Sequence, residues 1–188
     1  GAYYSKPLKA LAQRQFIRAA KGGIGGTKAA GNYGGAMQPS SIAKSQGYDQ
    51  IIWLDANEFK YIEEAGTMNI MVVINNTLLT PAAGTTTLAG ITRKSVLHLA
   101  RHWGMPVEER QVSIDEIVAA SKAGTLQEVF GVGTAATVSS IQEIGYEGND
   151  YKLPALHDGL FSAKVNKYLS DLRYGKIADE FGWMTKVL

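Results

Sequence analysis

The pattern of hydrophobic and polar positions along the chain predicts short β-strands in two blocks. YDQIIWLD (48–55) has a continuous apolar centre, which is typical of a buried strand, and NIMVVI (69–74) has the same character. LQEVFGVGTAATVSSIQEI (126–144) has the pattern of a strand, a turn and a second strand. Further strands are predicted in PLKALAQRQFIRAA (7–20), FKYIEE (59–64) and MPVEERQVS (105–113), and LLTPAAG (78–84) ends the first block with turn residues.

Other segments have the three- and four-residue apolar spacing of amphipathic helices. GITRKSVLHLARHWG (90–104) and LHDGLFSAKVNKYLSDLRYG (156–175) show this spacing most clearly. Residues 34–46 also have helical character and stop before Gly47, whereas Pro39 predicts a kink or a later start.

A fourth helix is indicated by the polar residues at its start. Ser113 and Glu116 have the spacing of a capping box ahead of IVAASKAG (117–124). Strand clusters that are interrupted by several helices predict an α+β, or mixed α/β, domain.

Composition and charge narrow the class of protein. The chain has 188 residues, 45% hydrophobic and 19% charged, as expected of a globular domain with a sizeable core. Lys and Arg number 19 against 17 Asp and Glu, so the net charge of +2 does not point to nucleic acid or an anionic membrane as partner. No cysteine occurs, which excludes disulfides and thiolate metal sites and makes the cytoplasm the expected compartment.

Neither a membrane span nor a signal peptide is evident in the sequence. The longest apolar run, in MNIMVVI (68–74), is too short to cross a bilayer. Because the chain begins with Gly1 and runs directly into strand-like sequence, we expect that an N-terminal portion precedes it.

The segment GGIGGTKAAGNYGG (22–35) surrounds a single lysine, Lys28, with glycine. A phosphate-binding loop requires lysine directly after glycine, but Thr27 separates Gly26 from Lys28. A Rossmann fingerprint is also excluded, since Lys28 stands at the position of its third glycine. Two interpretations remain open: a surface turn with a solvated lysine, or a pocket that Lys28 shares with Tyr33.

Three further segments allow both a structural and a functional interpretation. GVGTAA (131–136) matches a dinucleotide fingerprint, but the β-branched residues after it favour a strand, so a turn that offers N–H groups to an anion is preferred. GITRKS (90–95) is either an ordinary helix start or a phosphate site at a helix N-terminus. EEAGTMN (63–69) is either a turn or a buried carboxylate that faces a cationic partner.

His98 and His102 lie four residues apart on one predicted helix. The metalloprotease motif needs glutamate directly after the first histidine, and leucine stands there instead. We therefore expect solvated or core histidines and no metal site.

In this order, GGTKAAGNYGG, EEAGTMN, GITRKS and FGVGTAA resemble the branched-chain amino acid aminotransferases, and DQIIWLD and FGWM add to the resemblance. It extends over essentially the whole chain, and the EAGTMN form resembles the branched-chain enzymes rather than the D-amino acid or aminodeoxychorismate branches. The resemblance implies the fold of the D-amino acid aminotransferase group, in which a barrel-like sheet is flanked by helices. It also implies pyridoxal phosphate as cofactor, and amino transfer between Leu, Ile or Val and 2-oxoglutarate.

The same resemblance implies roles for the residues around the cofactor ring. Lys28 matches the lysine that forms the internal Schiff base and then moves the proton between substrate and cofactor. Tyr33 matches the phenol that bonds the ring oxygen, and Glu64 matches the carboxylate paired with the pyridine nitrogen. Thr67 matches a residue that lines the ring.

Other roles concern the cofactor phosphate and the substrate. Ile91 and Thr92 match the backbone N–H donors to the phosphate at a helix start. Thr134 matches a phosphate ligand that also lies at the substrate, and Ala135 matches the backbone donor to the substrate carboxylate.

The resemblance further implies a domain arrangement and an assembly state. Residues 1–188 match the larger, C-terminal cofactor-binding domain, and the small N-terminal domain is expected to lie outside this chain. The family is usually a homodimer that acts on amino acids and 2-oxo acids. Three alternatives stay open: D-amino acid transamination, an aminodeoxychorismate lyase-like reaction on the same fold, and an inactive truncated domain.

Overall fold

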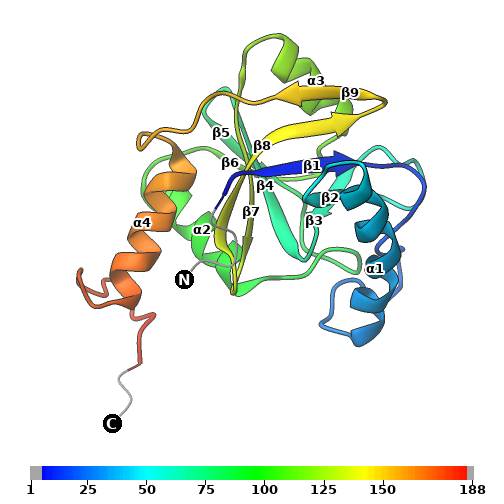
Figure 1. Cartoon of the computed structure of the whole chain (residues 1–188). Helices are drawn as coiled ribbons and strands as arrows, with labels where there is room; N and C mark the ends of the chain where they lie inside the picture. The colour runs from blue at the N-terminus through cyan, green and yellow to red at the C-terminus, as the bar shows by residue number, and fades with distance from the viewer. Residues whose placement is uncertain (1–5, 186–188) are drawn as a thin grey trace.

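The computed structural model describes residues 6–185 of the chain, and its elements follow one another as strand clusters separated by helices (Figure 1). In chain order they are β1 (Leu8–Ala12), α1 (Ala30–Ser45), β2 (Gln50–Leu54), β3 (Ile62–Ala65), β4 (Met68–Ile74), β5 (Thr77–Thr80), α2 (Ile91–His102), β6 (Val107–Glu109), α3 (Ile114–Lys122), β7 (Leu126–Gly133), β8 (Thr137–Tyr146), β9 (Asn149–Lys152) and α4 (Phe161–Arg173).

Six strands close into a barrel. They are hydrogen-bonded in the order β3-β2-β1-β8-β7-β4, and β4 pairs with β3 to complete the ring. β1 runs parallel to both of its neighbours, β2 and β8, whereas the other contacts in the ring are antiparallel. β5 and β6 extend the sheet beyond β4, and β9 pairs with β8. The expected α+β fold with a barrel-like sheet and flanking helices is therefore confirmed.

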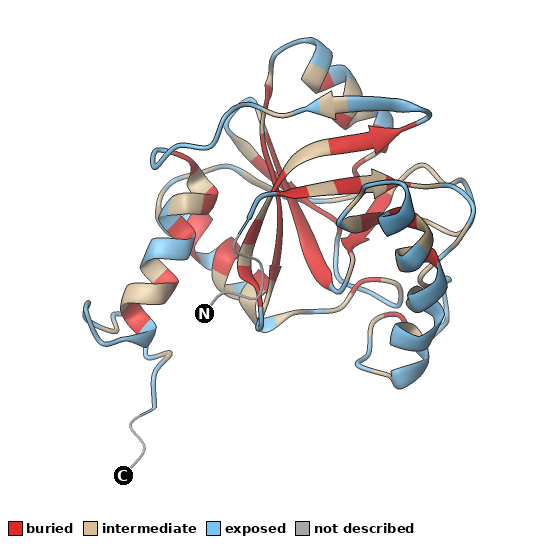
Figure 2. Cartoon of the chain, in the orientation of Figure 1, coloured by how far each residue is buried: buried red, intermediate tan, exposed pale blue. Residues whose placement is uncertain are grey.

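The continuous apolar runs of the central strands are explained by burial on both faces (Figure 2). Along β4, Ile70 and Val72 face the barrel interior, while Met71 and Val73 face a second apolar cluster outside it. The interior cluster is shared with α3, and the outer cluster is covered by α2 and α4. A third, smaller cluster lies between α1 and β2, around Trp53.

The first predicted strand is much shorter than expected, and the helix after it starts earlier. Instead of 7–20, the strand covers Leu8–Ala12, because Oε1 of Gln13 accepts hydrogen bonds from the N–H groups of Gln15 and Phe16 and turns the chain. Helix α1 begins at Ala30 rather than 34 and continues through Pro39.

Most other predicted elements are present, with moved ends. The capping interaction is confirmed on the side of Ser113, whose hydroxyl oxygen accepts a hydrogen bond from the N–H of Glu116 at 3.0 Å. Helix α4 starts at Phe161 instead of 156. At this start, the Glu128 carboxylate on β7 accepts hydrogen bonds from the N–H groups of Phe161 and Ser162. The short polar strand β9 has no hydrophobic alternation and was not predicted.

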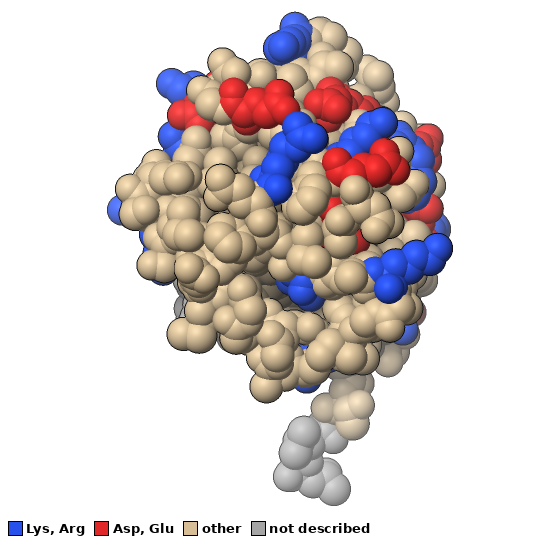
Figure 3. All heavy atoms as spheres, turned by 90° about the vertical axis from the view of Figure 1, so that its right-hand side faces the viewer, with Lys and Arg blue, Asp and Glu red and all other residues tan. Residues whose placement is uncertain are grey.

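The surface shows mixed charge. On the face that includes α1, Lys and Arg alternate with Asp and Glu over the upper part, and much of the lower part is uncharged (Figure 3). None of the helices within residues 6–185 is long and apolar enough to span a membrane.

The predicted pair His98 and His102 packs on Phe181, with ring centroids 4.4 and 5.1 Å from it.

Candidate functional site

One hollow of about 220 Å³ brings together residues from four separate parts of the chain, and we call it the main hollow. Strand register explains part of this meeting. Glu64 on β3 pairs with Asn69 on β4, and Asn69 pairs with Val132 on β7, so that these three positions lie side by side across the sheet. The main hollow is lined by Lys28, Glu64, Thr67, Asn69, Leu88, Ala89, Gly90, Ile91, Thr92, Val132, Gly133 and Thr134.

Glu64 is the buried acid of the main hollow, with 4% of its surface exposed. Its Oε1 accepts hydrogen bonds from the N–H of Leu88 at 2.9 Å and from Nδ2 of Asn69 at 3.4 Å. Burial raises the pKa of Glu64 to about 7, against the opposing effects of the Arg18 charge and the Leu88 N–H. A cationic group in the hollow would therefore favour the ionised carboxylate.

The start of α2 forms a second wall of the main hollow. Its N-cap is Gly90, which offers no side-chain cap, and the first turn has no acidic residue. The N–H groups of Ile91 and Thr92 have no acceptor within the helix, so they are available to an anion. A Cβ at Gly90 would lie 2.2 Å from Oδ1 of Asn69, so a larger residue at position 90 would displace the Asn69 side chain.

Lys28 reaches the main hollow from a glycine loop that is fixed against the loop before α2. The N–H of Gly26 donates to the carbonyl oxygen of Thr85 at 2.8 Å, and a Cβ at Gly26 would lie 2.1 Å from the carbonyl oxygen of Gly84. Nδ2 of Asn32 donates to the carbonyl oxygen of Thr27 at 2.9 Å, which joins the loop to the first turn of α1. The glycines thus permit backbone contact beside an exposed lysine.

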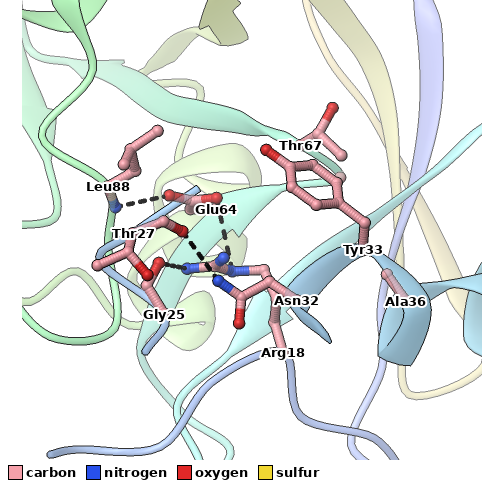
Figure 4. Close-up of a pocket in the computed structure, with 10 residues that line it drawn as sticks. Arg18, Gly25, Thr27, Asn32, Tyr33, Ala36, Glu64, Thr67 and Leu88 are labelled. Carbon is pink, nitrogen blue, oxygen red and sulfur yellow. Dashed lines mark hydrogen bonds and ion pairs between the residues drawn. The ribbon is translucent and has the colours of Figure 1, made fainter. Parts of the chain in front are cut away.

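Tyr33 does not line the main hollow but an adjoining one, which we call the Tyr33 hollow (Figure 4). The two hollows share Glu64, Thr67 and Leu88. Tyr33 stands on the first turn of α1 with its hydroxyl end toward Thr67, and 46% of the residue is exposed.

Six of the eight predicted site residues therefore line one hollow, namely Lys28, Glu64, Thr67, Ile91, Thr92 and Thr134. Ala135, the eighth, lies beside Thr134 in the exposed turn between β7 and β8 and lines neither hollow.

Sequence reasoning did not single out Arg18, Asn69 or Leu88. Asn69 ends the motif EEAGTMN, so its place beside Glu64 follows from the hairpin between β3 and β4. Arg18 and Leu88 had no comparable signal, since each contacts Glu64 through a loop distant in sequence.

Within residues 6–185, no cluster of three or more His, Asp and Glu side chains is arranged to hold a metal ion.

The family model described as amino-transferase class IV matches residues 3–144, and the chain belongs to this family. The chain is 42% identical over 190 residues to branched-chain-amino-acid aminotransferase 2 of Bacillus subtilis strain 168; the match covers 100% of this chain and 52% of that protein. It is 34% identical over 194 residues to the branched-chain-amino-acid aminotransferase of Mycolicibacterium smegmatis, with 53% of that protein covered. The chain thus spans about half the length of the curated relatives it matches.

Solved structures show the same fold. The Escherichia coli branched-chain amino acid aminotransferase superposes with a TM-score of 0.83 at 28% identity, covering 100% of this chain and 60% of that one. The branched-chain amino acid aminotransferase of Thermobaculum terrenum, solved in its PLP-form, superposes with a TM-score of 0.81 at 26% identity, covering 96% and 55%.

Proposed function

We propose that this chain is the cofactor-binding domain of a pyridoxal-phosphate-dependent branched-chain aminotransferase, and that the small N-terminal domain lies outside residues 1–188. The whole protein would transfer amino groups between Leu, Ile or Val and 2-oxoglutarate. The observation that supports this most strongly is the meeting of an amine, a buried carboxylate and a helix N-terminus in the main hollow. The names of the relatives supply the substrate class.

The residues of the main hollow fit pyridoxal phosphate by their chemistry. The uncapped N-terminus of α2 is suited to a phosphate, which would be held by the N–H groups of Ile91 and Thr92 together with Thr134 of the same hollow. Glu64, buried and with a raised pKa, is suited to a cationic ring nitrogen. When bound, the cofactor would supply the electron-withdrawing ring that stabilises negative charge at the substrate Cα.

The roles of the chain's own groups follow from this placement. Nζ of Lys28 would hold the cofactor aldehyde covalently and, once released, would move the proton between the substrate Cα and the aldehyde carbon of the cofactor. The Tyr33 hydroxyl would donate to the ring oxygen, and Thr67 would lie against the ring between the two hollows. The N–H of Ala135 would bind the substrate carboxylate at the turn after β7.

Borohydride reduction of the full-length protein with pyridoxal phosphate, followed by peptide mapping, tests the covalent role. We expect one labelled residue, Lys28, and no label in Lys28→Ala. Lys21→Ala is the matched control, because Lys21 is exposed in the same loop. A label on another lysine in the wild-type protein, or none, would contradict the assignment.

Substrate profiling separates the alternatives on this fold. Turnover of L-leucine, L-isoleucine and L-valine is expected, and activity restricted to D-amino acids or to lyase substrates would contradict the branched-chain assignment. An inactive domain remains an alternative for the 188-residue chain alone, because it spans only about half of its relatives. A chain of 188 residues that binds pyridoxal phosphate without turnover would agree with that alternative.

We further propose that the whole protein is a cytoplasmic homodimer. The resemblance to the family supports the homodimer, and the lack of cysteine supports the compartment. Sedimentation of the full-length protein measures the assembly state directly.

A further inference from the structure

Arg18 ties three segments of the candidate site together with one buried guanidinium group, and Figure 4 shows its contacts with Gly25 and Glu64. Its side chain is only 7% exposed. One guanidinium nitrogen donates to the carbonyl oxygen of Gly25 at 3.1 Å and also to that of Thr86. Nε lies 3.5 Å from Oε2 of Glu64 and has no hydrogen-bond partner within the described residues. The loop of Lys28, the loop before α2 and strand β3 thus meet at one cation.

A second buried carboxylate, Glu63, lies beside this group. Glu63 is 7% exposed, and its Oε2 has no hydrogen-bond partner in the described part of the chain. The Thr86 side chain hydrogen-bonds Glu63, and the charge of Arg18 acts on it as well. Burial nevertheless raises the pKa of Glu63 above its ordinary value.

A β-bulge explains why two consecutive side chains share one cation. The pairing of β3 with β2 passes from Glu64 opposite Trp53 to Ile62 opposite Leu54, so Glu63 is the additional residue. In a regular strand, consecutive side chains point to opposite faces, and a bulge breaks this alternation. Both carboxylates are therefore within the electrostatic reach of Arg18.

The charges in this cluster do not cancel. Two carboxylates stand against one guanidinium, and a buried carboxylate stays ionised only when an opposite charge or donors offset its desolvation. The Glu64 carboxylate is offset by the charge of Arg18 and by the Leu88 N–H. The Glu63 carboxylate is offset by Thr86 and Arg18, with the Asp55 charge opposing. The two acids thus compete for the same cation.

We propose that Arg18 is a positioning residue that favours the ionised form of the Glu64 carboxylate and directs it at the main hollow, and that Glu63 weakens this effect by sharing the guanidinium. The inference rests on the proposed function for the cofactor that Glu64 would contact. It predicts that Arg18 and Glu63, both buried beside Glu64, have opposite effects on the ionisation of the Glu64 carboxylate. Loss of Arg18 disfavours the Glu64 carboxylate, whereas loss of the Glu63 charge leaves Arg18 to Glu64 alone.

The test measures the dissociation constant for pyridoxal phosphate against pH in the full-length protein, from the absorption of the bound cofactor. In Arg18→Met, the pH midpoint of tight pyridoxal phosphate binding is expected to rise by about 1 unit. In Glu63→Gln, this midpoint is expected to fall below the wild-type value. Arg18→Lys should restore part of the shift, because it returns the charge without the fork of donors. Arg14→Met is the matched control, since Arg14 lies in the same loop and pairs with Glu147 at the surface.

The proposal would be overturned if the pH midpoint moved in the same direction in Arg18→Met and Glu63→Gln, or in neither. Nonspecific disruption of the site would shift the midpoint in the same direction in both variants. If Arg18→Met does not fold, Glu63→Gln and Arg18→Lys are compared instead, and their pH midpoints should again shift in opposite directions from the wild-type value. If the proposed function itself is wrong, the wild-type protein will show no label on Lys28 after borohydride reduction with pyridoxal phosphate. In that case the same variants are compared by unfolding against pH without cofactor, where the pH dependence assigned to Glu64 must move in opposite directions.

Discussion

The N–H of Leu88 donates to Oε1 of Glu64 at 2.9 Å, across 24 residues of sequence. This bond joins strand β3 to the segment that leads into α2, so the buried carboxylate and the N–H groups at the helix start keep a fixed relation. Nδ2 of Asn69, which also donates to the Leu88 carbonyl oxygen at 2.8 Å, reinforces the joint from β4. A ligand with a cationic end and an anionic end would find both partners in one hollow.

The raised pKa of Glu64 predicts a pH-dependent stability that Glu64→Gln removes. The folded-state pKa of about 7 exceeds the ordinary value of 4.5, so the folded protein holds this proton where the unfolded chain releases it. Stability from this group is fully present below pH 4.5 and is lost as pH rises through 7. Relative to wild type, we expect Glu64→Gln to gain up to about 3 kcal/mol in free energy of unfolding between these limits, in urea titrations without cofactor.

Glu58→Gln is the control for this experiment, because Glu58 is an exposed carboxylate before the same strand. Its stability difference from wild type should stay constant over the same pH range. A constant difference for Glu64→Gln as well would contradict the assignment.

Ile91→Pro removes a single N–H from the start of α2 with little disturbance of the helix. Proline is well tolerated at the first helical position, and Gly90 before it is already extended, with φ −63° and ψ 141°. If this N–H binds the cofactor phosphate, affinity for pyridoxal phosphate should fall about tenfold or more, as for loss of a hydrogen bond to a charged group. Ile91→Ala keeps the N–H and should bind like the wild type; equal affinities for both variants argue against the phosphate site.

Substitution by alanine is expected to have opposite effects on stability at two glycines of 22–35, one in the loop contact and one in helix α1. Gly26→Ala places a Cβ against the Gly84 carbonyl oxygen and should destabilise the protein by about 1–3 kcal/mol. Gly35→Ala lies in α1 with open space around its Cβ and should stabilise by about 0.5–1 kcal/mol. Chemical denaturation of both variants measures this, and a loss at Gly35 equal to that at Gly26 would show that the loop contact is not the cause.

Ser113→Ala should cost about 1 kcal/mol in free energy of unfolding, because the N–H of Glu116 loses its acceptor at the start of α3. Ser121→Ala makes the same change inside that helix, where alanine is favoured, and should not destabilise. Thermal unfolding of the two variants gives the comparison. Similar losses in both would show that Ser113 does not act as a cap.

The sequence by itself determined much of the architecture. Apolar runs such as IIWL in β2 and NIMVVI in β4 identified buried strands, since burial on both faces leaves few polar positions. The apolar spacing of 90–104 and the capping signal at Ser113 marked two helices that the structure confirms, because both signals depend only on residues close in sequence. Motif order led to the family and to six residues that line the main hollow.

Only the tertiary structure decided how the strands close and what surrounds Glu64. Barrel closure depends on pairings between distant strands, such as β1 with β8, and no local pattern encodes them. The end of β1 depends on a side-chain turn at Gln13 that competes with the strand. The motif EEAGTMN already contained Glu63 and suggested a buried carboxylate that faces a cation, but it did not identify Arg18 as that cation or show that Glu63 and Glu64 share it. This sharing arises from burial and a β-bulge, which bring side chains from separate segments into a low-dielectric interior.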